Sequence, residues 1–173
     1  MRKVTYGGAS SLDALITGPD ESIDWIRHSD EGAELTKEMW RGVDTMLMGR
    51  KTYEFAVRMG GPISWGSIKT YVFSRTLESV SGGAELVSGD AVEFVRELKG
   101  QEGGDIIVMG GGELGTSLIE GGLVDEVGLN IQPVMLGRGT PAFQPMNRRV
   151  DLELIEARPI AQDCVLVRYR IAG

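Results

Sequence analysis

The sequence DIIVMGGGELG, from Asp105 to Gly115, places three consecutive glycines directly after a short apolar run. Such a run bounded by glycines is typical of a buried strand, and the residues after the glycines have helical character. Glycines at a turn of this kind let the backbone approach a phosphate, and the following helix offers unpaired N–H groups to it. The stretch therefore predicts a strand-to-helix turn that is either a phosphate cradle or only a tight connection.

Gly110, Gly112 and Gly115 match the G-x-G-x-x-G spacing of dinucleotide-binding proteins. That fingerprint normally lies in the first strand–helix unit, whereas this one lies well past the middle of the chain. In that fingerprint, the acid that binds a ribose also lies at the end of the next strand, whereas Asp125 and Glu126 lie at the start of the next strand here. These two differences argue against a Rossmann domain and leave both interpretations of the turn open.

The composition indicates one globular domain over residues 1–173, with 42% hydrophobic and 25% charged residues. Lys and Arg number 18 against 25 Asp and Glu, and this acidic balance argues against a nucleic-acid partner. The single cysteine, Cys164, fits a reducing compartment. No stretch is long and apolar enough for a membrane span, and the first residues lack the apolar core of a signal peptide. We therefore expect a cytoplasmic protein with no membrane partner.

Strands and helices alternate along most of the chain. Apolar runs predict strands at 4–9, 44–49, 69–74, 84–89 and 105–109, and within 124–136, with a long loop at 10–25. Helices are predicted at about 30–40 with Ser29 as N-cap, and at 50–59, 90–100 and 114–120. The tail alternates with period two, placing Val165, Val167, Tyr169 and Ile171 on one side, and predicts two antiparallel strands joined around Pro159–Asp163. The pattern predicts an α/β fold with a mainly parallel central sheet and an antiparallel C-terminal hairpin.

Two further strand ends carry polar residues that suit a phosphate. Gly49 ends a strand, and Arg50, Lys51 and Thr52 begin the next helix, where basic residues oppose the helix dipole unless an anion lies nearby. The sequence FSRT, at 73–76, places Ser74 and Arg75 just beyond another strand, where open α/β sheets bind ligands. A solvated basic turn is the alternative for the first of these. Taken with the triple glycine, the three strand ends predict a phosphate-rich ligand, and the basic side chains favour NADP over NAD.

Several motifs occur together in one order: GASSLDALIT at 8–17, DWI at 24–26, DTMLMGRKTYE at 44–54, YVFSRTL at 71–77, and a long block at 106–143. This order resembles the dihydrofolate-reductase-like family, and most closely the C-terminal reductase domain of the bifunctional riboflavin-biosynthesis deaminase/reductase. The resemblance covers nearly the whole chain and implies a three-layer domain that uses NADPH. Carried over by position, it implies cofactor roles for Gly49, Arg50, Lys51, Thr52, Ser74, Arg75, Gly110, Gly111, Gly112, Glu113 and Leu114. Ala14 stands where the family has a glycine, in a loop that covers the nicotinamide.

A reductase of this type holds a planar substrate against the cofactor and supplies a proton. Asp13 and Asp24, both in the loop after the first strand, are the candidate catalytic or substrate-binding acids, although Asp24 is equally well explained as a turn residue. A folate-type enzyme also needs an acid on the first helix. Glu31, Glu34 and Glu38 are available there, but their spacing fits a solvated face equally well.

The resemblance implies a 5-amino-6-(5-phosphoribosylamino)uracil reductase-type activity on a small molecule. The alternatives are a dihydrofolate, pterin or other small-molecule reductase, and a non-catalytic NADPH-binding dimer. One histidine and one cysteine cannot form the zinc site of the deaminase half, so we expect no metal. The terminal hairpin offers an edge that a second subunit could cover, which predicts a homodimer.

Overall fold

An eight-stranded sheet forms the centre of the structure, a computed structural model in which residues 1–172 are described. The strands are β1 (Val4–Ser11), β2 (Leu15–Thr17), β3 (Val43–Gly49), β4 (Lys69–Phe73), β5 (Glu85–Val87), β6 (Asp105–Met109), β7 (Glu126–Gln132), β8 (Thr140–Pro141), β9 (Leu152–Ile160) and β10 (Cys164–Ile171). The helices are α1 (Asp30–Met39), α2 (Arg50–Arg58), α3 (Ala91–Gly100) and α4 (Gly112–Glu120).

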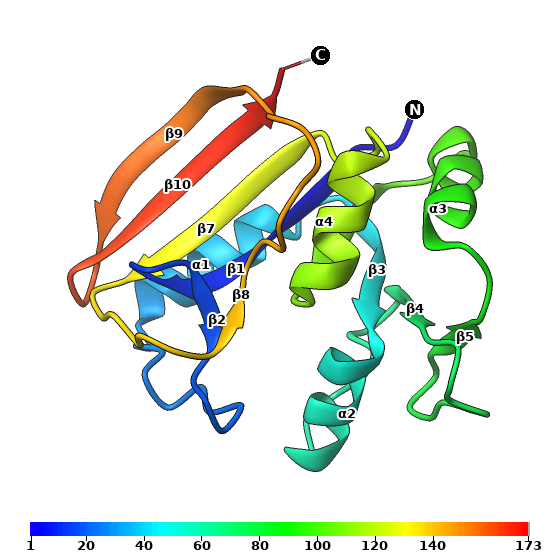
Figure 1. Ribbon diagram of the computed structural model, residues 1–173, viewed down its shortest axis with the longest axis horizontal. Coiled ribbons are helices and arrows are strands. Elements are labelled where there is room, and N and C mark those ends of the chain that lie inside the picture. The colour runs from blue at the N-terminus through cyan, green and yellow to red at the C-terminus, as the bar shows by residue number, and fades with distance from the viewer. Residues whose placement is uncertain (173) are drawn as a thin grey trace.

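The strand order β5-β4-β3-β6-β1-β7-β10-β9 confirms the predicted sheet. Neighbours from β5 to β7 pair in parallel, whereas β10 pairs antiparallel with β7 and with β9. Figure 1 shows the β9–β10 hairpin at one edge of the sheet and the short strands β4 and β5 toward the other. Because the strands of the central block are parallel, their carboxyl ends all lie along the same edge of the sheet, the edge that runs across the ends of the strands.

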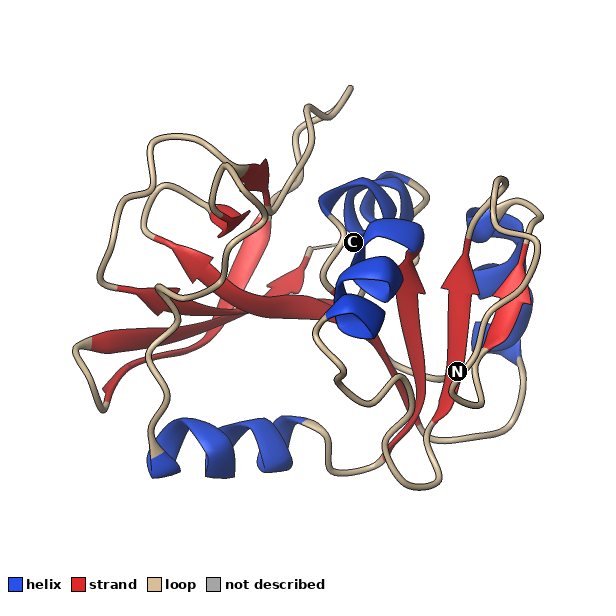
Figure 2. Cartoon of the chain, turned by 90° about the horizontal axis from the view of Figure 1, so that it is seen from below, coloured by secondary structure: helices blue, strands red, loops and turns tan. Residues whose placement is uncertain are grey.

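Helices lie on both sides of this sheet, which makes the three layers expected of the fold (Figure 2). On one side, α3 and α4 pack with Leu47, Ile106 and Val108 in the larger core cluster. On the other side, α2 packs with Met46, Met48 and Ile107. Successive residues of β3 and β6 therefore face opposite cores, and both strands are continuous apolar runs because both of their faces are buried.

Most predicted elements are confirmed to within two residues, and the differences have local causes. Ser29 caps α1, since its side chain accepts a hydrogen bond from the backbone N–H of Gly32. The helix α4 begins at Gly112, two residues before the predicted start, because glycines at its first positions hide the helical pattern. The loop predicted at 10–25 was wrong in part, since β1 continues to Ser11 and the short strand β2 pairs with β8.

Candidate functional site

The three predicted ligand-binding segments follow neighbouring strands. Phe73 at the end of β4 is in register with Gly49 at the end of β3, and β3 also pairs in parallel with β6. The segments that begin at Ser74, Arg50 and Gly110 consequently emerge side by side from one edge of the sheet (Figure 1). The structure brings these segments together.

A separate physical reason explains why each position of the triple-glycine turn is occupied by glycine. Gly110 and Gly111 have φ angles of 57° and 72°, in the left-handed region that favours glycine. A Cβ on Gly112 would lie 2.3 Å from the carbonyl oxygen of Pro141. A Cβ on Gly115, at the last position of the fingerprint, would lie 2.5 Å from the ring of Tyr6. The spacing that resembles a Rossmann fingerprint is thus explained in part by packing against β8 and β1.

The same turn also lies against the start of α2. A Cβ added to Gly110 would lie 3.1 Å from the Thr52 hydroxyl oxygen. A Cβ added to Gly111 would lie 3.6 Å from the same oxygen and 3.8 Å from the Gly49 nitrogen. A Cβ on Gly49 would meet nothing within 4 Å, so open space adjoins the turn. Two of the three segments therefore form one continuous backbone surface.

The N-termini of α2 and α4 differ from those of the other two helices. The helices α1 and α3 are capped by the side chains of Ser29 and Asp90, which accept hydrogen bonds from first-turn N–H groups. The helices α2 and α4 begin after Gly49 and Gly111, and neither of these N-caps makes a side-chain hydrogen bond. Uncapped N–H groups and the positive end of the helix dipole attract anions. Both uncapped helices begin at the same edge of the sheet, beside each other.

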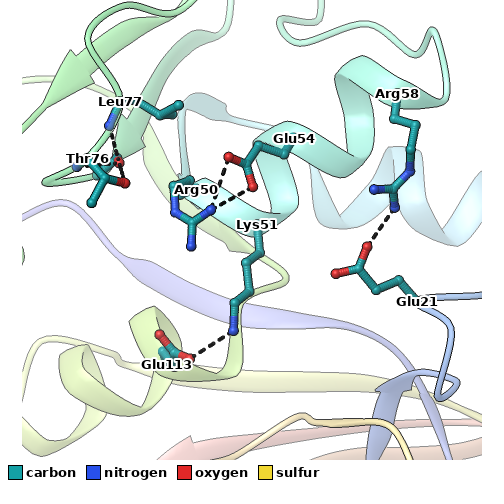
Figure 3. A network of polar contacts seen from close by, with 9 residues as sticks. Glu21, Arg50, Lys51, Glu54, Arg58, Thr76, Leu77 and Glu113 are labelled. Carbon is teal, nitrogen blue, oxygen red and sulfur yellow. Dashed lines mark hydrogen bonds and ion pairs between the residues drawn. The ribbon is translucent and has the colours of Figure 1, made fainter.

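Ion pairs connect the basic residues here to acids (Figure 3). The Arg50 guanidinium donates to both carboxylate oxygens of Glu54, one turn along α2, at 3.0 Å and 2.9 Å. The Lys51 ammonium lies 3.3 Å from the Glu113 carboxylate at the start of α4, and both side chains are largely exposed. Exposed pairs contribute about 0–1 kcal/mol, so a phosphate can displace the acids at small cost. Leu114, in contrast, is buried in the larger core cluster, and its Cβ lies 3.9 Å from the position for a Cβ on Gly111.

The third segment is an ordered turn. The Ser74 hydroxyl, which is nearly buried, accepts hydrogen bonds from the backbone N–H groups of Thr76 and Leu77 at 3.1 Å and 3.0 Å. Arg75 is exposed, and it forms no ion pair with any acid among residues 1–172. Its guanidinium can therefore bind an anion without first breaking a pair.

Asp13 connects two loops and is held as a carboxylate. Its oxygens accept hydrogen bonds from the Ser11 hydroxyl at 2.6 Å and from the backbone N–H groups of Leu136 and Gly137 at 3.1 Å and 2.8 Å. These bonds lower the pKa of Asp13 from 3.8 to about 2, the Ser11 hydroxyl having the largest effect. A carboxylate with this pKa is a poor proton donor near neutral pH, and its contacts suit it to holding the loop.

The loop that Asp13 holds has a strained residue beside it. Ala14 stands where the dihydrofolate-reductase-like family has a glycine, and its φ is 58°. A left-handed alanine costs about 1 kcal/mol or more relative to glycine. Asp24 lies farther along the same connection as an exposed turn residue, beside Trp25, whose indole donates to the Ser22 carbonyl. The structure therefore does not bring Asp13 and Asp24 into one hydrogen-bonded site.

A cavity of about 540 Å³ lies next to the triple-glycine turn. Its lining comes from α1, from the connection after α2 and from the end of β6, through Thr36, Lys37, Trp40, Trp65 and Met109. Met109 directly precedes Gly110 and forms, with Gly7, the last pair between β6 and β1. Beyond Gly7, β1 pairs only with β7, and a Cβ on Gly8 would meet nothing within 4 Å. The cavity thus adjoins the place where the sheet opens.

The acids proposed for a folate-type site do not line this cavity. Glu31 accepts a hydrogen bond from the backbone of Ala161, Glu34 pairs with Lys37, and Glu38 lines a separate pocket on the other side of α1. Four residues of the cavity lining were not predicted from the sequence: Thr36, Lys37, Trp40 and Met109. The spacing of Thr36, Lys37 and Trp40 along α1 gives no signal of its own, because an aromatic residue at a helix end is more often part of a core.

None of the helices within residues 1–172 is both long and apolar enough to cross a membrane. No group of three His, Cys, Asp or Glu side chains in that part of the chain could hold a metal ion.

Comparisons with known proteins agree with this architecture. The family model described as the RibD C-terminal domain matches residues 2–166. The chain is 32% identical over 184 residues to "Uncharacterized protein YyaP" of Bacillus subtilis (strain 168), covering 99% of this chain and 96% of that protein. A putative riboflavin biosynthesis protein from Shewanella sp. PV-4 has a similar structure, with a TM-score of 0.85, 22% identity and 100% coverage of both chains.

A dihydrofolate reductase from Enterococcus faecalis, solved with NADP(H), also shares the fold, with a TM-score of 0.73 and 14% identity, covering 99% of this chain and 97% of that chain. At these identities the two structural matches establish the fold, whereas the family model spans nearly all of the sequence. The resemblance noted in the sequence is confirmed, and the chain belongs to the RibD C-terminal domain family.

Proposed function

We propose that this protein is an NADPH-dependent reductase that transfers hydride to a small planar substrate. One observation carries the proposal: two helices without side-chain caps, α2 and α4, begin side by side where Arg50, Lys51 and the triple glycine gather. Backbone N–H groups and basic side chains in this arrangement suit the phosphates of a dinucleotide.

The residues present fit such a cofactor. The open space beside Gly49 and the left-handed turn at Gly110 and Gly111 leave the backbone accessible. Arg75, on the neighbouring segment, offers a guanidinium that pairs with no acid within residues 1–172, and its use for an additional phosphate would favour NADPH over NADH. When bound, NADPH supplies the hydride.

The protein's own residues position the reactants and shape the site. Thr52, with the backbone at Gly110, lines the cofactor side, and the cavity next to Met109 receives the substrate. Asp13 holds the loop after β1 against residues 136–137, and in this proposal its role is positioning. Asp24 remains a candidate for contacting the substrate or for relaying a proton through water.

Because of the family resemblance, the first substrate to test is a ribosylated aminopyrimidine, in a 5-amino-6-(5-phosphoribosylamino)uracil reductase-type reaction. A pterin, dihydrofolate or another small carbonyl or imine compound is the second candidate. The third possibility is a non-catalytic NADPH-binding dimer.

The test combines binding with turnover. Fluorescence titration measures the Kd for NADPH and NADH, and absorbance at 340 nm follows NADPH oxidation with the aminopyrimidine and with dihydrofolate. We expect NADPH to bind at least about tenfold more tightly than NADH, a difference of about 1.4 kcal/mol. Absence of NADPH binding would contradict the proposal as a whole. Tight binding with no oxidation of NADPH by any substrate would favour the non-catalytic alternative.

A further inference from the structure

We infer that Asn130 binds a carbonyl oxygen of the substrate ring through its side-chain N–H groups, and that Gln132 fixes the direction in which this amide points. This role rests on the proposed reductase function and assigns a specificity residue to it. The uracil ring of the first proposed substrate carries carbonyl oxygens of the kind that such a donor selects.

Asn130 lies on β7, on the face of the sheet that α1 covers. It is in register with Leu166 of β10, which belongs to the core cluster beneath α1, and with Ala9 of β1. Alternate residues of a strand share a face, so Gly7 and Ala9 point to the same side as Asn130. Gly7 is in turn in register with Met109, which lines the cavity of about 540 Å³. Asn130 therefore shares its face of the sheet with the cavity.

This part of the sheet face is open. Both β1 and β7 have a neighbouring strand on each side, and central strands of such a sheet are normally buried on both faces. On the far face of β1, Tyr6 and Ser10 are indeed buried. On the face toward α1, however, Gly7, Ala9 and Asn130 are only half-buried. A flat ring that lies beside the cofactor segments can therefore reach the side chain of Asn130.

The direction of the Asn130 amide follows from the groups behind it. The backbone N–H of Arg27 donates to Gln132 at 2.8 Å, and because a backbone N–H can only donate, the atom that it meets is the carbonyl oxygen Oε1. The Cys164 thiol lies 3.4 Å from the same oxygen. The amide nitrogen of Gln132 is then left to donate to Asn130 Oδ1, at 3.0 Å. Since Gln132 is fully buried, water does not replace these partners.

The group of Asn130 that remains is a donor. Its Nδ2 donates to no group within residues 1–172. In that part of the chain, Arg158 Nε is the one buried side-chain nitrogen or oxygen atom without a hydrogen bond, so Asn130 Nδ2 is accessible to solvent. A fixed and accessible donor without a protein partner favours a carbonyl oxygen over an amino group at the same place on a ligand.

Two ring compounds of the same shape test this preference. 5,6-Diaminouracil has carbonyl oxygens at the two positions where 2,4,5,6-tetraaminopyrimidine has amino groups. NMR titration of the ¹⁵N-labelled protein, saturated with NADP⁺, measures the Kd of each compound. We expect the wild type to bind the diaminouracil more tightly by about tenfold or more, with a shift of the Asn130 side-chain NH₂ resonances.

Three results would overturn the inference: equal affinities for the two compounds, no binding of either compound to the NADP⁺-loaded protein, or binding that leaves the Asn130 resonances unmoved. Failure of the protein to bind NADP⁺ or NADPH would instead overturn the proposed function on which the role of Asn130 rests.

The substitution Asn130→Asp replaces the donor with a carboxylate of the same size that only accepts. Gln132 can still donate to this carboxylate, so the contact within the sheet is kept. The variant should prefer the tetraaminopyrimidine by about tenfold or more, with the Kd for NADP⁺ unchanged. The matched control is Gln101→Glu, the same change of amide to carboxylate at the exposed C-cap of α3. Retention of the wild-type preference in Asn130→Asp, or equal changes in both variants, would refute the role of Asn130.

A second substitution tests whether Gln132 fixes the amide. Gln132→Met keeps a side chain of similar volume but cannot donate to Asn130, so the Asn130 amide becomes free to turn over. The preference between the two compounds should then fall to about threefold or less. An unchanged preference in the folded variant would refute the role of Gln132, whereas the Asn130 measurements do not depend on this variant.

Discussion

At the scale of single residues, Asp13 shows how a loop acid acts through its hydrogen bonds. Its pKa in the folded protein is about 2, below its ordinary value of 3.8, so ionised Asp13 stabilises the fold. That contribution is complete above the ordinary pKa and is lost as the pH falls toward 2. Asp13→Asn removes the titrating group together with one of its acceptor oxygens.

We therefore expect the Tm of the wild type to fall more steeply between about pH 4 and pH 2 than the Tm of Asp13→Asn. Thermal denaturation followed by circular dichroism at several pH values checks this. Asp24→Asn is the control, since Asp24 is an exposed loop acid and makes no side-chain hydrogen bond to residues 1–172. Parallel pH profiles for the wild type and Asp13→Asn would contradict the assignment.

Arg75 is a basic residue of the site that pairs with no acid among residues 1–172. Arg75→Gln should weaken NADPH binding by about tenfold and NADH binding much less, because a charged hydrogen bond to a phosphate contributes about 1.5–3 kcal/mol. Fluorescence titration with both nucleotides measures this selectivity. Arg96→Gln, on α3 away from these segments, is the control. A uniform loss of affinity for both nucleotides would argue that Arg75 does not contact the additional phosphate.

At the scale of elements, the contact between α4 and β1 explains the last glycine of the fingerprint. A Cβ on Gly115 would lie 2.5 Å from the Tyr6 ring, which is fully buried and whose hydroxyl donates to the Ala142 carbonyl. Because the ring is held at both ends, it cannot move away. Gly115→Ala should lower the free energy of unfolding by about 1–3 kcal/mol through overpacking.

The matched control is Gly100→Ala at the end of α3, where a Cβ would meet nothing within 4 Å. This change should leave stability unchanged or raise it by about 0.5–1 kcal/mol. Urea unfolding of both variants provides the comparison. Equal stabilities would show that helix α4 can shift away from β1 without cost.

At the scale of the whole molecule, the terminal hairpin leaves an apolar surface uncovered. Leu152, Leu154 and Ile155 of β9 and Val165 of β10 are all exposed large hydrophobic residues. Such a surface on an edge hairpin is typical of an interface, and it supports the homodimer expected from the sequence. We therefore expect the protein to sediment as a dimer.

Leu154→Glu should weaken that dimer by about tenfold or more, because it places a charge in an apolar contact. Leu12→Glu is the control, since Leu12 is an exposed leucine of similar accessibility in the loop after β1. Sedimentation velocity over a range of concentrations distinguishes the two variants. A wild-type monomer, or equal behaviour of both variants, would rule out this hairpin as the interface.

Much of the architecture could be predicted from local patterns. The parallel strands β3 and β6 are buried on both faces, and continuous apolar runs such as DTMLMG and DIIVM predict this directly. The meeting of the three polar segments at one edge of the sheet could also be predicted, because each follows a parallel strand and the carboxyl ends of parallel strands lie together. The pairing of β2 with β8 could not, since these strands are too short to have a period and depend on the backbone of distant residues.

The sequence was sufficient for the order of strands and helices and for the residue types at each strand end, because propensity and periodicity act within a few residues. Tertiary structure was required to decide what each of those residues does. Register places Gly49 beside the triple glycine, the backbone N–H groups of residues 136–137 add to the effect of Ser11 in lowering the pKa of Asp13, and the backbone of Ala161 engages Glu31. These outcomes depend on contacts between residues far apart in the chain, and short-range patterns do not encode them.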